Sequence, residues 1–237
     1  MAPLTVVFDL DGTLVDTAPD LIEALNVVFG HEGLPPIAYA EARNMIGGGA
    51  RRMIESALQL EGGAKGRAKS HAMSGGAVDR MLADFVSHYA DHIADRSQPF
   101  PGLDAALDHL AARDCRFAVC TNKLEGLSRL LLEALGLTRR FEAICGQDTF
   151  GVQKPDPEML RRTIQAAGGQ IQRAIMVGDS GTDIATARAA GIPVVAVDFG
   201  YSETPVRQLG PDRLIGHFDE LAAAVLELTL ELAPRTP

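Results

Sequence analysis

The sequence lacks tryptophan, is poor in aromatic residues and contains no long apolar run. Among 237 residues there is no tryptophan, and 5% of the residues are aromatic. No segment reaches the roughly 18 uncharged apolar residues that a membrane-spanning helix requires, and the first segment has no basic stretch typical of a signal peptide. We therefore expect neither a membrane span nor a signal peptide, and we predict a cytoplasmic protein with no membrane partner.

Cysteine is also scarce, and its placement does not indicate a metal site or a disulfide framework. The chain has three cysteines, an odd number, and no two of them have the CxxC spacing of a zinc site. Cys120 and Cys145 end the apolar runs RFAVC and FEAIC. We predict that they are reduced core residues, and we assign the cysteines no function.

An excess of basic residues is absent as well. The formal net charge is -9 at pH 7 and the isoelectric point is near 5.1, which disfavours nucleic acid as a main partner. The hydrophobic content of 46% is enough for one sizeable core, or for a core and a smaller second domain. We expect a monomer or a homodimer that binds no nucleic acid.

Short apolar runs alternate with helical patterns in the second half of the chain, which is typical of βα units in a parallel sheet. The expected strands are Val6 to Phe8, Phe117 to Cys120, Ala143 to Cys145, Ala174 to Val177 and Val194 to Val197. The expected helices are Leu103 to Ala112, Leu124 to Leu135, Pro157 to Ala167, Asp183 to Ala190 and Leu221 to Leu232. We predict an α/β fold with a Rossmann-like, doubly wound parallel sheet as its core.

The segment from about Ala18 to Asp95 has a different pattern. It is helical, contains no convincing strand and is interrupted by the glycine-rich stretches GGGARR and EGGAKGRAKSHAMSGGA. Because this segment follows the first strand and precedes the others, we predict an inserted α-helical domain at residues 18–95. The core would then comprise residues 1–17 and 96–237.

The second glycine-rich stretch, residues 61–77, is one residue away from a nucleotide-binding loop. Ala68 stands where that loop needs its second glycine, and the stretch follows a helical run instead of a strand. We therefore reject nucleotide binding and interpret the stretch as a solvated loop. His88 and His92, four residues apart on an expected helix, are interpreted as part of an exposed helical face because no further ligand completes a metal site.

Polar side chains follow three of the expected strands. They are Asp9 and Asp11 after the first strand, Thr121, Asn122 and Lys123 after RFAVC, and Asp179 and Asp183 after AIMV, while a loop adds Lys154. Ligands bind at the carboxyl ends of the strands in such sheets, so we expect these side chains to converge. Four carboxylates at one edge require a cation, and hard oxygen ligands suit Mg²⁺. The cluster predicts phosphate chemistry in which one carboxylate attacks phosphorus and another transfers protons.

Each of these residues also has a simpler interpretation. Thr121 and Asp183, taken singly, are explained as N-caps of helices, and Lys154 is explained as a surface lysine. Capping predicts scattered positions, however, and it does not account for convergence on one edge. The spacing of Asp9 and Asp11 alone does not decide which of the two attacks.

Four segments in this order resemble the motifs of the haloacid dehalogenase superfamily. They are Asp9-Leu10-Asp11-Gly12-Thr13, Thr121-Asn122, Lys154-Pro155 and Gly178-Asp179 to Asp183. The resemblance implies that Asp9 is the nucleophile, that Asp11 is the general acid and base, and that Thr121, Asn122 and Lys154 bind the phosphoryl group. It also implies that Mg²⁺ is held by Asp9, the backbone carbonyl of Asp11 and Asp179, with Asp183 in support. Dehalogenases of the superfamily lack the second aspartate, so Asp11 indicates phosphoryl transfer.

Within the superfamily, the chain is most similar to the bacterial phosphatases that release glycolate and phosphate from 2-phosphoglycolate. This similarity implies a phosphoric monoester hydrolase that acts on a small phosphorylated metabolite, and it makes the inserted domain a cap. A phosphosugar phosphatase, a phosphoglucomutase-like enzyme and a catalytically idle binding module remain as alternatives. Gly48 and Arg51 in GGGARR are candidate substrate-binding residues, with Arg52 as the alternative to Arg51 for the substrate's carboxylate. Their simpler interpretation is a turn between helices with solvated arginines.

Overall fold

The computed structural model describes residues 2–72 and 75–232, without the side chains of residues 62–72, 75, 231 and 232. The chain divides into two compact units, one formed by Met1–Asp16 and Gln98–Pro237 and the other by Thr17–Ser97. We call them the sheet unit and the helical unit. The catalytic and cap roles that the sequence assigns to these parts of the chain stay predictions.

Six parallel strands form the sheet of the sheet unit, in the order β5-β4-β1-β6-β7-β8. They are β1 (Leu4–Phe8), β4 (Cys115–Cys120), β5 (Ala143–Cys145), β6 (Ala174–Gly178), β7 (Val194–Val197) and β8 (Arg213–Ile215). The predicted parallel α/β core is therefore confirmed. The strand order runs outward from β1 on both sides, so the carboxyl end of β1 lies at the topological switch point, where ligands bind in such folds.

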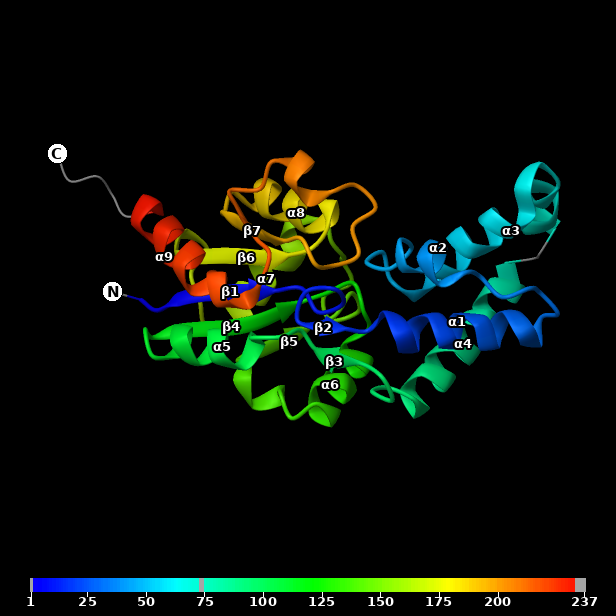
Figure 1. Ribbon diagram of the computed structural model, residues 1–237, viewed down its shortest axis with the longest axis horizontal. Coiled ribbons are helices and arrows are strands. Elements are labelled where there is room, and N and C mark those ends of the chain that lie inside the picture. The colour runs from blue at the N-terminus through cyan, green and yellow to red at the C-terminus, as the bar shows by residue number, and fades with distance from the viewer. Residues whose placement is uncertain (1, 73–74, 233–237) are drawn as a thin grey trace. The chain divides into compact units, whose positions relative to one another are not determined.

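Helices cover both faces of this sheet (Figure 1). The helices are α5 (Leu103–Ala111), α6 (Glu125–Ala134), α7 (Pro157–Ala166), α8 (Gly181–Ala190) and α9 (Leu221–Leu232), with short 3-10 turns at η1 (Thr138–Arg140), η2 (Ile171–Arg173), η3 (Val206–Leu209) and η4 (Phe218–Glu220). Helices α7 and α8 pack together on one face, α5 and α9 pack together on the other, and α6 contacts β5. No helix in the described part of the chain is both long and apolar enough to cross a membrane.

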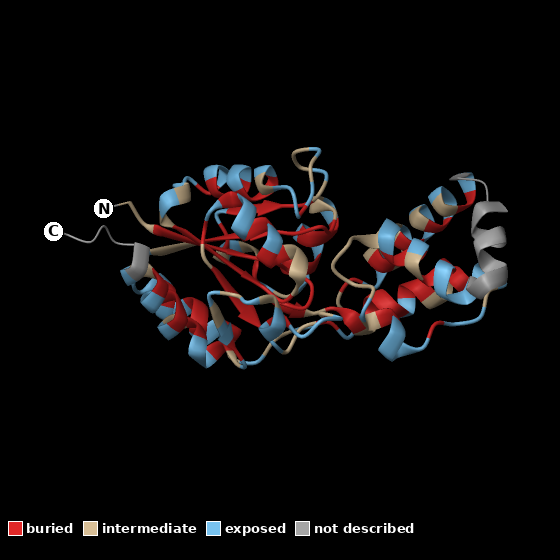
Figure 2. Cartoon of the chain, turned by 90° about the horizontal axis from the view of Figure 1, so that it is seen from above, coloured by how far each residue is buried: buried red, intermediate tan, exposed pale blue. Residues whose placement is uncertain are grey.

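The central strands of the sheet are mostly buried, as their red colour in Figure 2 shows, whereas the edge strand β8 has one buried residue, Ile215. All five residues of β1 are buried, which is expected of a strand with helices on both faces. Cys120 and Cys145 are paired across β4 and β5, and both lie in the hydrophobic cluster beneath α7. All three cysteines are free. The prediction that Cys120 and Cys145 are reduced core residues is confirmed.

The helical unit contains α1 (Ala18–His31), α2 (Tyr39–Arg43), α3 (Ala50–Ala72) and α4 (Gly75–Asp91), and α4 packs against α1 and α3. Its helical character is as the sequence indicates. The predicted solvated loop at residues 61–77 is wrong, because α3 continues to Ala72 and α4 begins at Gly75. The alanine, lysine and arginine residues of this stretch have high helix propensities, which offset the cost of its glycines. Residues 73–74 of the stretch lie outside the described residues.

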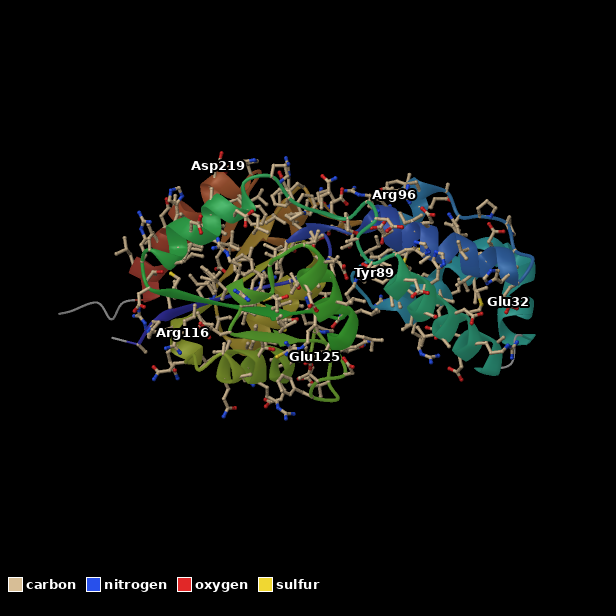
Figure 3. All side chains as sticks on the ribbon, turned by 90° about the horizontal axis from the view of Figure 1, so that it is seen from below. Glu32, Tyr89, Arg96, Arg116, Glu125 and Asp219 are labelled. Atoms are coloured by element: carbon tan, nitrogen blue, oxygen red, sulfur yellow. The ribbon has the colours of Figure 1, made fainter. Side chains whose placement is uncertain are left out.

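Two short strands lie where the chain leaves and re-enters the sheet unit. They are β2 (Val15–Asp16) and β3 (Gln98–Pro99), and they pair in antiparallel orientation. On the helical side of this junction the buried carboxylate of Asp20 accepts hydrogen bonds from the backbone N–H of Arg96, which is labelled in Figure 3, and from the N–H and hydroxyl of Ser97. The carboxylate therefore ties the first turn of α1 to the last residues of the helical unit.

Candidate active site

The structure brings seven of the predicted site residues together at the carboxyl edge of the sheet. These buried residues are Asp9, Asp11, Thr121, Asn122, Lys154, Asp179 and Asp183. Strands β1, β4 and β6 end directly before Asp9, Thr121 and Asp179, respectively. Parallel strands present their carboxyl ends at one edge, which is why residues more than a hundred positions apart in the sequence meet there.

Lys154 lies at the centre of this cluster and is not a surface lysine. Its side chain is 1% exposed, and its Nζ lies 2.9 Å from Asp9 Oδ1 and 2.6 Å from Asp183 Oδ1. Burial by itself would lower the pKa of Lys154, but the negative charges of Asp183 and Asp9 raise this pKa above its usual value. The site therefore contains a permanent positive charge between two carboxylates.

Asp9, Asp179 and Asp183 can place one oxygen each within 4.8 Å of one another, and they are the one group of this kind among the described residues. Burial raises the pKa of Asp9 to about 7, and the charge of Asp183 adds to this effect against the opposing charge of Lys154. Burial and the charges of Asp183 and Asp9 raise the pKa of Asp179 to about 8. Buried oxygen ligands that repel one another in this way fit a hard divalent cation.

Asp179 is held in one orientation by its surroundings. The Thr13 hydroxyl donates to its Oδ1 at 3.0 Å, and the backbone N–H of Tyr201 donates to its Oδ2 at 2.7 Å. Two glycines lie against the carboxylate: a Cβ at Gly12, where φ is +80°, would lie 2.4 Å from Asp179 Oδ2, and a Cβ at Gly200 would lie 2.2 Å from Asp179 Cβ. Both positions therefore require glycine.

The capping interpretations have different outcomes at Asp183 and Thr121. Asp183 is part of a capping box with Ser180 at the start of α8, and its other oxygen accepts from Lys154. Capping and membership of the cluster thus occur together at Asp183. Thr121 does not cap α6, whose N-cap is Leu124, and its hydroxyl accepts instead from the N–H of Lys123 at 3.2 Å.

Asp11 forms an ion pair with Lys123, a residue to which the sequence analysis gave no role. Lys123 Nζ lies 2.7 Å and 3.0 Å from the two Asp11 oxygens, and the lysine side chain is 4% exposed. The sequence feature that could have indicated this role is the position of Lys123 just after a strand, at the sheet edge where the carboxylates gather. Asp9 and Asp11 therefore have separate ammonium partners. When all four carboxylates are ionised, the two lysines leave two negative charges, which one divalent cation would balance.

The side chain of Asn122 crosslinks the two loops of the site. Its amide group donates to the carbonyl of Lys154 at 3.1 Å, and its Oδ1 accepts from the N–H of Lys154 at 2.9 Å. Asn26 makes the same pair of bonds to Ile37 in the helical unit. Asn122 thereby fixes the backbone from which Lys154 extends.

We predict that Asn122→Ala lowers the free energy of unfolding by about 1–3 kcal/mol, because it leaves buried backbone groups of Lys154 unsatisfied. It should also lower kcat, since Lys154 loses its fixed position. Urea unfolding and steady-state kinetics measure the two effects. Asn26→Ala is the matched control, and we expect it to reduce stability with kcat unchanged. Equal kcat values in the two variants would contradict the prediction.

The two candidate residues of the helical unit have local partners. Arg51 Nη2 lies 2.6 Å from Asp79 Oδ1, and both side chains are about half exposed. Gly48 lies in the turn before α3, and a Cβ there would lie 2.5 Å from Cδ of Arg52. The roles of Gly48 and Arg51 in substrate binding stay predictions.

Comparison with known proteins identifies the family of the chain. The model of the family described as haloacid dehalogenase-like hydrolase matches residues 6–197. The chain belongs to this family. The matched residues include all four motif segments of this haloacid dehalogenase-like hydrolase, so the resemblance seen in its sequence is confirmed.

Relatives of the hydrolase carry the names of phosphatases. A phosphoglycolate phosphatase of Mesorhizobium japonicum is 47% identical over 228 residues, which are 96% of this chain and 97% of the relative. A crystal structure of a predicted phosphoglycolate phosphatase from Haemophilus somnus has a TM-score of 0.85 and 26% sequence identity, and the match covers 96% of this chain and 98% of that one. The prediction of a phosphoric monoester hydrolase is confirmed.

Proposed function

We propose that this hydrolase is a Mg²⁺-dependent phosphatase that converts 2-phosphoglycolate to glycolate and phosphate through an aspartyl-phosphate intermediate. The observation that carries the proposal is the buried Lys154 between Asp9 and Asp183. The names of its relatives support the choice of substrate, because the one from Mesorhizobium japonicum aligns with 96% of the chain. We further propose that the enzyme acts in the cytoplasm as a monomer or homodimer, with no nucleic-acid or membrane partner.

Mg²⁺ would be held by Asp9, the backbone carbonyl of Asp11 and Asp179, with Asp183 in support. Phosphatases of this family generally use a divalent metal, and the crowded carboxylates of the site are compatible with one. When bound, the ion supplies a positive charge that polarises the phosphoryl group. The chain's own residues then carry the reaction.

In the first step, a carboxylate oxygen of Asp9 attacks phosphorus and the bond from phosphorus to the ester oxygen breaks. Asp11 donates a proton to the departing oxygen, so that glycolate leaves as a neutral alcohol at that position. Lys154, 2.9 Å from Asp9 Oδ1, offsets the negative charge that gathers around the phosphoryl group. Thr121 would donate a hydrogen bond to a phosphoryl oxygen.

In the second step, Asp11 takes a proton from a water molecule, which attacks the phosphorus of the aspartyl-phosphate. The bond from phosphorus to Asp9 breaks, which releases phosphate and restores the carboxylate. Lys123 holds both oxygens of Asp11 at 2.7 Å and 3.0 Å and thereby fixes the direction of this carboxylate. The separate lysine partners of Asp9 and Asp11 support a division of labour between the two aspartates.

A panel of phosphate esters tests the proposal. We expect 2-phosphoglycolate to have the highest kcat/KM among 2-phosphoglycolate, glucose 6-phosphate, β-glucose 1-phosphate and pyrophosphate, and we expect EDTA to abolish phosphate release. Preference for a sugar phosphate would favour a phosphosugar phosphatase, and isomerisation of glucose 1-phosphate without phosphate release would favour a mutase. Absence of any turnover with Mg²⁺ would favour an idle binding module.

A further inference from the structure

Tyr201, in the loop after β7, contacts Asp179 and the strand β2 at the same time. Its backbone N–H donates to Asp179 Oδ2 at 2.7 Å, and its phenol hydroxyl donates to Asp16 Oδ1. The residue is 3% exposed. We propose that Tyr201 is a positioning residue that orients the Asp179 carboxylate for Mg²⁺ by anchoring its loop to β2. This inference rests on the proposed function in assigning Asp179 to the metal.

The ring of Tyr201 is packed into the same group of atoms as the carboxylate. A Cβ at Gly12 would lie 2.8 Å from the Tyr201 ring and 2.4 Å from Asp179 Oδ2. The turn that follows Asp9, the tyrosine ring and the carboxylate therefore lie in direct contact. A shift of Tyr201 would change the position of its N–H donor and, with it, the direction of the Asp179 oxygen that accepts from it.

The loop also lies against Asp179 through Gly200, where a Cβ would lie 2.2 Å from Asp179 Cβ. A cavity borders this carboxylate and is lined by Gly200 and Ser202 of this loop and by Arg207 of η3. Packing alone is incomplete where such a cavity lies, so directional hydrogen bonds decide the position of the group. The phenol of Tyr201 donates one of these hydrogen bonds, and its acceptor, Asp16, lies on β2, outside the loop.

Asp16, which accepts the hydrogen bond from the Tyr201 phenol, lies where the two units are connected. It is the last residue of the sheet unit before the chain enters the helical unit, and in β2 it pairs with Gln98 of β3, where the chain returns. The bond from Tyr201 to Asp16 therefore joins the proposed metal ligand Asp179 to the strand pair that carries both connections. Thr13, a residue of the first motif segment, donates the other hydrogen bond to Asp179, whereas the bond to Asp16 comes from Tyr201, which lies outside the motif segments.

The experiment compares Tyr201→Phe, Asp16→Ala and the double variant. Isothermal titration calorimetry gives the Kd for Mg²⁺ without substrate, and kinetics with 2-phosphoglycolate gives kcat and KM separately. We expect each single variant to weaken Mg²⁺ binding about 3- to 10-fold and to lower kcat by a similar factor, with KM unchanged, since one hydrogen bond is lost. The double variant should bind Mg²⁺ as tightly as either single variant, because each of the two substitutions removes the same hydrogen bond.

Tyr39→Phe is the matched control, since this tyrosine is 50% exposed in the helical unit, and it should leave the Kd for Mg²⁺ unchanged. A Tyr201→Phe enzyme with a lower Tm but with Kd and kcat within twofold of the wild type would overturn the inference, and so would additive effects in the double variant. If Tyr201→Phe does not fold, the two variants of Asp16 are compared instead. Asp16→Asn keeps an acceptor oxygen and should bind Mg²⁺ more tightly than Asp16→Ala, and equal Kd values would overturn the inference. Wild-type enzyme that binds Mg²⁺ but does not hydrolyse 2-phosphoglycolate would contradict the proposed function and leave the metal-binding test intact.

Discussion

Asp9→Asn should abolish phosphate release while it leaves the fold intact. The amide has nearly the shape of the carboxylate but is a poor nucleophile, so no aspartyl-phosphate can form. We expect kcat to fall by at least about 10⁴-fold, which is the scale of the loss when a nucleophile is removed from an enzyme. Steady-state kinetics with 2-phosphoglycolate measures the fall, and rapid-quench mass spectrometry detects the phosphorylated protein, which should be present only in the wild type.

Asp108→Asn is the control for this substitution, because Asp108 is an exposed aspartate that pairs with Arg140 away from the site. It removes a carboxylate of the same size and should leave kcat unchanged. Retention of more than a few per cent of wild-type kcat by Asp9→Asn would contradict the role of Asp9 as nucleophile. A phosphoryl group located on Asp11 instead of Asp9 would exchange the roles of the two aspartates.

The same variant should be more stable than the wild type at alkaline pH in the absence of metal. Burial raises the pKa of Asp9 to about 7 in the folded protein, above its ordinary value of 3.8. An acid with a raised pKa contributes stability that is fully present below the ordinary pKa and is lost as the pH rises through the folded value. In EDTA, the Tm of the wild type should therefore fall between about pH 4 and pH 7 more steeply than that of Asp9→Asn.

The sequence was most informative where a buried strand meets a polar segment. Strand β1 has five consecutive apolar or β-branched residues, and Asp9 follows it directly, so the position of this carboxylate at the sheet edge could be read from the pattern. The loop that holds Lys154 has no such marker. Its approach to Asp9 and Asp183 depends on the Asn122 crosslink between residues 32 positions apart, which periodicity does not reveal.

Other features were missed for different physical reasons. Strands β2 and β3 have two residues each, which is too short for any alternation to be recognised. Strand β8 has three residues like the predicted β5, but only Ile215 of β8 is buried, so it lacks the continuous apolar run of β5. The glycines of the stretch 61–77 indicate a loop, but α3 runs through residues 61–72 because the residues around these glycines favour a helix. The pattern places Lys123 after a strand but does not indicate its partner, because that partner is decided by tertiary structure and lies 112 positions away in the sequence.

Lys154→Met should be the most destabilising single substitution in the site. It leaves the buried carboxylates of Asp9 and Asp183 without the ammonium that lies 2.9 Å and 2.6 Å from them. Removing one partner of a buried ion pair costs about 3–5 kcal/mol, because the remaining charge has neither water nor a counterion. We expect a loss of this size at pH 8 in urea unfolding with EDTA, and a fall in kcat of about 10²- to 10³-fold in the folded fraction.

Two further variants separate charge from packing in this prediction. Lys154→Met combined with Asp183→Asn removes one carboxylate together with the lysine, so the double variant should regain part of the lost stability and none of the activity. Arg129→Met breaks the exposed pair with Glu125, and screening by water limits its cost to less than about 1 kcal/mol. If Lys154→Met costs no more than Arg129→Met, the carboxylates around Lys154 are protonated and the lysine does not balance charge. A loss that is equal in the single and double variants would instead assign the effect to the packing of the lysine side chain.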